Sequence, residues 1–72
     1  MKTITIYKIG DFWEMFSDDA ERAAKILGQT VTTRTSDGLK MVGFPISRER
    51  QYVEMLVAAG EVVKVGQRGM IP

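Results

Sequence analysis

Hydrophobic and polar positions alternate at the start of the chain in the manner of a strand. Residues 2–9 read KTITIYKI, in which Ile4 and Ile6 share one face while Tyr7 and Ile9 share the other. A strand with apolar side chains on both faces is typically buried on both sides. We therefore expect this strand to lie in the interior of its sheet.

A second strand is predicted directly after a turn. Gly10 and Asp11 interrupt the first strand as a turn or bulge would, and residues 12–16, FWEMF, resume an extended pattern. A helix is the competing interpretation of this stretch, because Phe12 and Phe16 also have helical spacing.

The first helix is predicted over residues 18–27. Asp18 is the candidate N-cap, with Glu21 at the third helical position completing a capping box, and Gly28 is placed to end the helix. Its apolar stripe consists of Ala20, Ala23, Ala24 and Leu27. Because the stripe is mostly alanine, this helix must pack closely against its neighbour.

A second helix is predicted over about residues 48–59, capped by Ser47 and ended by Gly60. The last strand follows at residues 61–66, EVVKVG. The apolar face of the helix is formed by Tyr52, Val53, Leu56 and Val57.

Two weaker strands are predicted between the helices. Residues 29–35 read as a strand with little to bury, near an edge, and residues 39–43 follow after a turn at 36–38. Pro45 closes that segment, because proline cannot donate to a ladder. The order is β-β-α-β-β-α-β, so the predicted fold is an α/β arrangement of a small mixed sheet with two helices, in one domain over residues 1–72.

The composition argues against catalysis. The chain has no cysteine and no histidine, so it lacks thiolates, the commonest general base and the commonest metal ligand. No phosphate-binding loop is present. We expect no enzymatic activity, no cofactor and no metal. With no membrane span and no signal peptide, we expect a cytoplasmic protein without a membrane partner.

An acidic cluster near the first helix has two interpretations. It comprises Asp11, Glu14, Asp18, Asp19 and Glu21. Such a cluster could hold a divalent metal ion. More often such acids complement the positive end of a helix, which is the interpretation favoured here.

The basic residues give no patch in the sequence. The net charge is +1, and six bases are scattered over the second part of the chain. They are Arg34, Lys40, Arg48, Arg50, Lys64 and Arg68. Each is expected in solvent, and phosphate contact becomes plausible only where several converge on one side.

Phe12 and Glu14 raise a question that spacing alone does not answer. As residues of one strand they share a face. By itself the pattern favours a core Phe12 beside an exposed Glu14 at the end of a strand. An exposed ring beside a carboxylate would instead indicate a binding site.

A family resemblance bears on that question. KIGDFWEMFSDDAERAAKILGQTVTTR resembles the start of the mismatch-recognition domain of the MutS family, approximately R-M/V-G-D-F-Y-E-L-F, an Asp-Ala-rich helix ending Leu-Gly, and a Leu-Thr-Lys-Arg strand. KMVGFP is similar to the family's M-A-G-V/I-P, and YVEMLVAAGEVVKV to its Y-L-x-K-L-V-x-A-G-Y-K-V-A. The resemblance covers nearly the whole chain in order.

The resemblance implies binding of mismatched or distorted double-stranded DNA. In that family the Phe of Phe-x-Glu enters the minor groove and stacks on an unpaired or mispaired base, the Glu hydrogen-bonds the same base, and the duplex kinks. Phe12 and Glu14 match these positions. Arg34 matches the Arg of the Thr-Lys-Arg strand near the DNA, and Met41 and Pro45 match the M-A-G-x-P loop on the same side.

The chain also departs from the family pattern. Trp13 replaces a Tyr, Ile46-Ser47 replaces a Tyr-His, and the loop between Arg34 and Met41 is shorter. The connector, lever, clamp and nucleotide-binding regions are missing, so the chain resembles an excised or separately encoded recognition domain. Alone it should bind DNA weakly, and further domains of a larger protein are expected partners. The alternative is a structural or protein-interaction module that keeps the fold without DNA binding.

Overall fold

The computed structural model describes residues 2–72 and contains one five-stranded sheet with two α-helices. The strands are β1 (Lys2–Ile9), β2 (Phe12–Phe16), β3 (Thr32–Thr33), β4 (Lys40–Pro45) and β5 (Glu61–Val65). The α-helices are α1 (Ser17–Leu27) and α2 (Glu49–Ala58), and the short 3-10 turns are η1 (Ile46–Arg48) and η2 (Arg68–Met70). This confirms the predicted α/β class and the predicted order of strands and helices. It also excludes a helix through residues 12–16.

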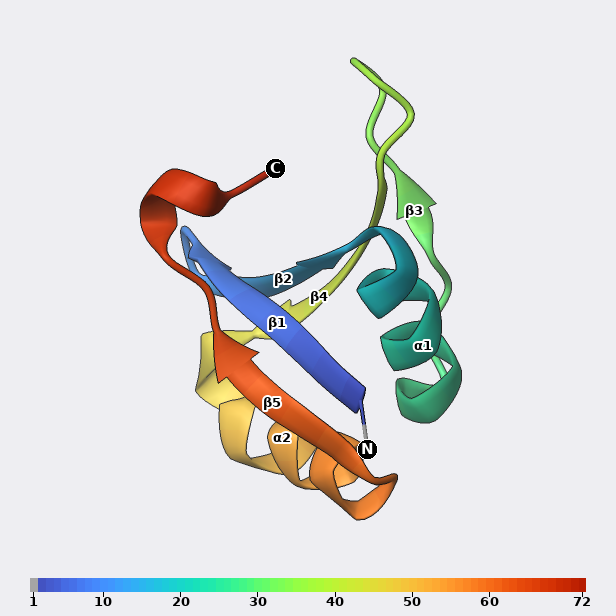
Figure 1. The fold of residues 1–72 in the computed structure, drawn as a ribbon, viewed down its shortest axis with the longest axis vertical. Helices are drawn as coiled ribbons and strands as arrows, with labels where there is room; N and C mark the ends of the chain where they lie inside the picture. The colour runs from blue at the N-terminus through green and yellow to red at the C-terminus, as the bar shows by residue number, and fades with distance from the viewer. Residues whose placement is uncertain (1) are drawn as a thin grey trace.

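The sheet is mixed, with the strand order β3-β4-β2-β1-β5 (Figure 1). The pairs β1–β2, β2–β4 and β3–β4 are antiparallel, whereas the first and last strands, β1 and β5, pair in parallel. As expected from its two apolar faces, β1 has a neighbour on each side. Both helices lie against one face of the sheet, which leaves the other face without a helix.

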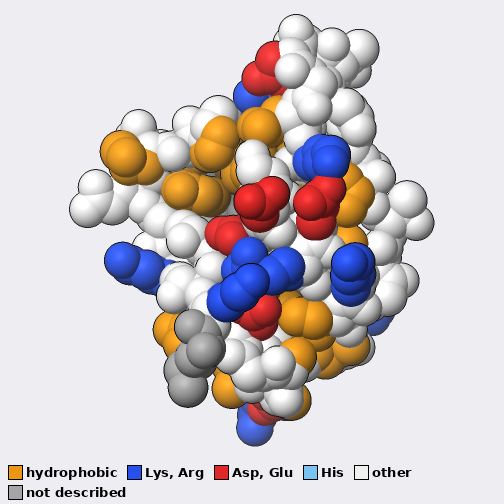
Figure 2. Space-filling model, turned by 45° about the vertical axis from the view of Figure 1, so that its right-hand side comes forward, with side chains coloured by type: hydrophobic (Ala, Val, Ile, Leu, Met, Phe, Trp, Pro, Cys, Tyr) orange, Lys and Arg blue, Asp and Glu red, His pale blue; other side chains and the backbone are white. Residues whose placement is uncertain are grey.

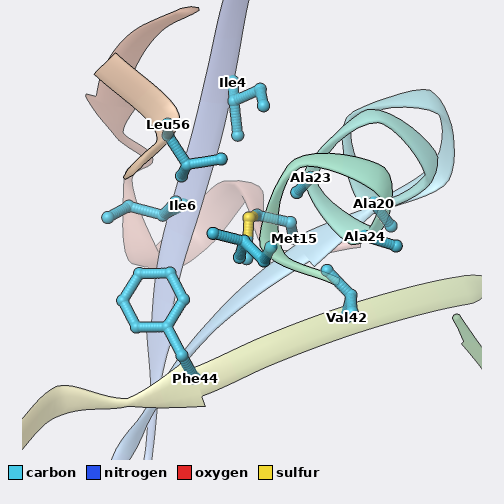
Figure 3. Packing of buried hydrophobic residues seen from close by; sticks show 10 residues of the cluster. Ile4, Ile6, Met15, Ala20, Ala23, Ala24, Val42, Phe44 and Leu56 are labelled. Atoms are coloured by element: carbon cyan, nitrogen blue, oxygen red, sulfur yellow. The ribbon is translucent and has the colours of Figure 1, made fainter. Parts of the chain in front are cut away.

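The core fills the space between the sheet and the helices (Figure 3). Ile4 and Ile6 of β1, Met15 of β2 and Phe44 of β4 are almost completely buried there. In Figure 3 the Phe44 ring points toward Ile6. The ring also stacks on Tyr52 of α2, with centroids 5.1 Å apart. Burial of these large side chains supplies most of the hydrophobic stabilisation of so small a chain.

Helix α1 packs through its small residues, as predicted, but it begins differently. Ala20, Ala23, Ala24 and Leu27 are all buried, and Gly28 ends the helix in the left-handed region with φ 68°. The predicted capping box of Asp18 and Glu21 is wrong. The helix starts at Ser17, whose φ is 57°, and no side chain caps it. Among the nearby acids, Asp19 instead accepts the backbone N–H of Thr5 at 3.0 Å.

Four other expectations need correction. The strand expected over residues 29–35 shrinks to Thr32–Thr33, and the strand expected over 39–43 extends through Pro45. Ser47 lies inside η1 and does not cap α2, which begins at Glu49. Val57 is more than half exposed and so does not belong to the apolar face of α2, on which Leu56 is fully buried. The structure places the other expected residues, Tyr52 and Val53, half-buried against the core.

Candidate nucleic-acid interface

The helix-free side of the sheet, called the open face below, carries the sequence-predicted site. Cross-strand pairing sorts its residues into rows. The first row is Ile9, Phe12 and Pro45; the second is Tyr7, Glu14 and Gly43; the third includes Phe16 and Met41. Four of the five predicted site residues, Phe12, Glu14, Met41 and Pro45, therefore stand on neighbouring rows of one face.

Phe12 is the most exposed aromatic residue of the strands. Its relative exposure is 46%, compared with 6% for Phe16 at the other end of β2. Its neighbours across the sheet are Pro45 of β4 and Ile9 of β1, which is itself 39% exposed. An apolar ring thus projects from an apolar row into water. The preference of spacing alone for a core Phe12 is wrong.

Trp13 shows why the strand orients Phe12 outward. Successive side chains of β2 alternate between the faces, so Trp13 and Met15 point toward the helices. The Trp13 indole packs against the core, and its Nε1–H donates to Glu49 Oε1 of α2 at 2.7 Å. With this side of the strand held by the core and a hydrogen bond, Phe12 must face the open side.

Glu14 lies flat on the sheet over Gly43. A methyl group placed at Gly43 would come within 2.7 Å of the Glu14 carboxylate carbon and of both its oxygens. Such a separation is too short for non-bonded atoms, so this position of the carboxylate requires glycine opposite it. The partial burial raises the pKa of the Glu14 carboxyl above its ordinary value. Glycine inside a strand often marks such a close approach, which the sequence could have indicated.

Arg34 stands at the far end of the open face. Its guanidinium pairs with Asp37 through Nε–Oδ1 at 3.0 Å and Nη2–Oδ2 at 2.6 Å, and Nη1 donates to the Pro72 carbonyl at 3.0 Å. The hydrogen bond from Arg34 lowers the pKa of the Asp37 carboxyl to about 2. Arg34 lies opposite Leu39, six positions along β4 from the partner of Phe12, which corresponds to about 20 Å. The structure therefore does not bring Arg34 together with Phe12.

On the side of the molecule that carries α1, basic side chains form ion pairs with neighbouring acidic side chains. Figure 2 shows Lys and Arg side chains interleaved with Asp and Glu across this side. Arg22 pairs with Asp19 and with Glu61, each at 3.2 Å, and Lys40 pairs with Glu21. In residues 2–72 the acids form no group of three that could hold a metal ion. The same residues contain no helix long and apolar enough to cross a membrane.

A hollow of about 640 Å³ beside Phe12 contains residues that the sequence did not single out. It is lined by Phe12, Pro45, Lys8 and Asp11, together with Gly10, Ile46 and Ser47. Lys8 was missed because it lies within β1, outside the group of bases in the second part of the chain. The open face thus combines a projecting ring with a carboxylate resting on glycine. Lys8 pairs with Trp13 and leaves β1 on the opposite face, but it lines the hollow at the end of the strand beside Phe12.

Comparison with protein families assigns the chain to a family. The sequence model described as MutS domain I matches residues 1–69. The chain belongs to the MutS domain I family. Membership supports, at the level of the family, a DNA-binding domain of the mismatch-recognition kind. MutS domain I is a non-catalytic part of its family's proteins, in agreement with the composition of this chain.

Proposed function

We propose that the open face binds duplex DNA and that Phe12 enters the duplex at a mismatched or distorted step. The observation that carries the proposal is the exposed Phe12 ring, standing on a strand whose other face is locked into the core. A side chain inserted between bases has to be held rigidly, because a mobile one would lose much conformational freedom on binding. The core contacts of Trp13 and Met15 provide that rigidity.

The energetics of insertion favour defective sites. An apolar wedge that enters the minor groove separates two stacked base pairs, which costs a few kcal/mol per step. The cost is lowest where pairing is already faulty. Phe12 has an apolar neighbour on each side, Ile9 and Pro45, which would lie against the groove wall as the ring enters.

Glu14 supplies discrimination in this proposal. Its carboxylate lies one row from Phe12, so it approaches the same DNA step. An ionised carboxylate near phosphates is repelled unless it meets a hydrogen-bond donor or takes up a proton. A displaced base offers such a partner more readily than a base held in an intact pair. Glu14 therefore penalises binding to matched duplex, a form of specificity by repulsion.

Met41, Pro45 and Arg34 extend the contact along the face. Pro45 stands beside the ring, Met41 lies two rows away from it, and Arg34 is at the far end. About 20 Å of B-DNA spans roughly six base pairs at 3.4 Å per step. Arg34 would meet the backbone several steps from Phe12 after releasing Asp37. With a net charge of +1, the domain binds weakly, and further domains of a larger protein would strengthen the grip.

A binding experiment with matched variants tests the proposal. Labelled protein is titrated with a duplex carrying one mismatch and with its fully paired counterpart, at low salt. The parent should prefer the mismatched duplex and show amide shifts around Phe12. Phe12→Ala should abolish the preference. Val57→Ala removes an exposed apolar side chain from α2 and should leave the preference intact.

Two outcomes would overturn the DNA assignment. One is an absence of shifts around Phe12 at millimolar DNA; the other is equal binding of both duplexes by the parent and by Phe12→Ala. The exposed ring would then serve as an anchor for a protein partner, which is the remaining function of such a surface.

A further inference from the structure

Two unpaired cations border a second hollow, next to the one that contains Phe12. This hollow, of about 340 Å³, is lined by Lys8, Gly10, Gly66 and Arg68. It shares Lys8 and Gly10 with the hollow beside Phe12, so the two are neighbours around the Gly10–Asp11 turn. It lies where the parallel strands β1 and β5 finish, because Gly10 follows β1 and Gly66 follows β5.

The two cations of this hollow differ from the bases that are already held by carboxylates. Within residues 2–72, neither Lys8 nor Arg68 forms an ion pair with a carboxylate. Arg34, Lys40 and Arg50, by contrast, each pair with an acid. A cation already paired with a carboxylate must give up that partner to bind a phosphate. Lys8 and Arg68 have no such partner to lose.

The floor of the hollow allows close approach. Gly10 and Gly66 carry no side chains, and the Gly66 N–H is already bonded to the Ile6 carbonyl at 2.8 Å. A methyl group at Gly66 would come within 2.2 Å of the Tyr7 ring. The tail is therefore held against β1, which places Arg68 of η2 on the same hollow as Lys8.

We propose that Lys8 and Arg68 form a clamp for one or two backbone phosphates of the DNA strand that flanks the Phe12 wedge. The clamp rests on the proposed function. Bending the duplex around an inserted ring costs energy that contacts with the adjacent backbone must offset. Phosphate contacts position a protein without reading sequence. Asp11 lines the hollow beside Phe12, and its negative charge directs phosphates toward the Lys8–Arg68 side.

Salt dependence of binding tests the clamp. In the parent we expect log K to fall with log salt at a slope of about −2 to −4, since each neutralised phosphate contributes about −0.9. Lys8→Gln and Arg68→Gln should each reduce the slope by about 1, and the double variant by about 2. Each of these variants should weaken binding to the matched duplex and to the mismatched duplex by the same factor. The preference for the mismatched duplex should therefore stay unchanged. Lys25→Gln, an equal loss of charge at an exposed position of α1, should leave the slope as it is.

A second arm separates the clamp from the wedge. Pyrophosphate is added to labelled protein at constant ionic strength, and the amides of Gly10, Gly66 and Gly69 are followed. Shifts in the parent that vanish in the double variant support the clamp even if no mismatch preference exists. The clamp is overturned if these amides do not respond, or if the double variant keeps the parent's salt slope. Failure of the wedge alone would leave both signals in place while removing the preference.

Discussion

The two faces of β2 differ in how far their side chains are exposed to solvent. Met15 on the helix-covered face is completely buried, whereas Phe12 on the open face is 46% exposed. Both are large apolar side chains on one five-residue strand. Alternation along the strand directs Trp13 and Met15 toward the core, whereas the open face is exposed at Phe12 and buried at Phe16. The first face therefore serves stability, and the Phe12 end of the second face is left to meet a partner. Substitutions on the two faces should have different consequences.

The largest effect is expected from emptying the core. Phe44→Ala removes a fully buried ring that stacks on Tyr52, and should cost about 3–5 kcal/mol of unfolding free energy. Phe12→Ala deletes the same side chain from the open face and should leave the melting temperature within a few degrees of the parent. Urea titration followed by Trp13 fluorescence compares the two. A Phe12→Ala variant that is unfolded under conditions where the parent folds would refute the division between the faces.

An intermediate effect is expected at the junction of strand and helix. Trp13→Ala loses half-buried packing and the hydrogen bond to Glu49, which together should cost about 2–4 kcal/mol. Trp13→Phe keeps most of the packing and should recover most of that stability. Thermal unfolding followed by circular dichroism measures both. If Trp13→Ala were as mild as Phe12→Ala, the orientation of the strand would have to be assigned to other contacts.

Glu14 should make the open face respond to pH. Because burial raises the carboxyl pKa in the folded state, the ionised side chain lowers stability at pH 7. That cost disappears as the pH falls through the folded-state pKa toward 4.5, where the folded protein takes up the proton first. Glu14→Gln should therefore be more stable than the parent at pH 7, with the difference shrinking as the medium is acidified. Glu54→Gln, exposed on α2, controls for the loss of one charge, and denaturant titration at several pH values provides the measurement.

The smallest effect is expected at the contact between Gly43 and the Glu14 carboxylate. Gly43→Ala should lift the Glu14 carboxylate off the sheet, so its pKa should move back toward the ordinary value while the fold is kept. Carboxyl-carbon NMR titration reports the change. Gly69→Ala is the matched control, since a methyl group there meets nothing within 4 Å. An unchanged Glu14 pKa in Gly43→Ala would mean that the carboxylate does not depend on the empty position opposite it.

Much of the fold could be predicted from periodicity, and the failures share one cause. The strands and helices with clear apolar patterns lie where expected. The capping box failed because α1 starts at Ser17, directly after β2, which leaves Asp18 inside its first turn. The adjacent Asp19 is held by the backbone of Thr5, fourteen residues away. The strand over residues 29–35 was overestimated because the chain pairs with β4 at only two positions. Thr5 and β4 both lie outside the segments concerned, so the pattern within those segments could not predict these contacts.

The candidate site also has one part that the local sequence predicts and another part that depends on contacts between distant segments. The relation of Phe12 to Glu14 follows from the alternation of one strand, and Asp37 lies close enough to Arg34 in sequence for their pairing to be foreseen. The separation of about 20 Å between Arg34 and Phe12 could be found only from the pairing register of β4. The approach of Arg68 to Lys8 depends on the pairing of β1 with β5, which no short segment of sequence reveals.

The parallel pairing of the first and last strands also has a kinetic consequence. Lys2 aligns with Glu61 and Ile6 with Val65, so this pairing closes a loop of nearly the whole chain. Long-range pairings form late and slow a folding reaction, because closure entropy must be overcome before the contacts form. The antiparallel β1–β2–β4 segment, joined by shorter connections, can assemble first and carry Phe12 and Glu14. On a ribosome, β1 and β2 would emerge early, but β1 would keep one unpaired edge until β5 was synthesised.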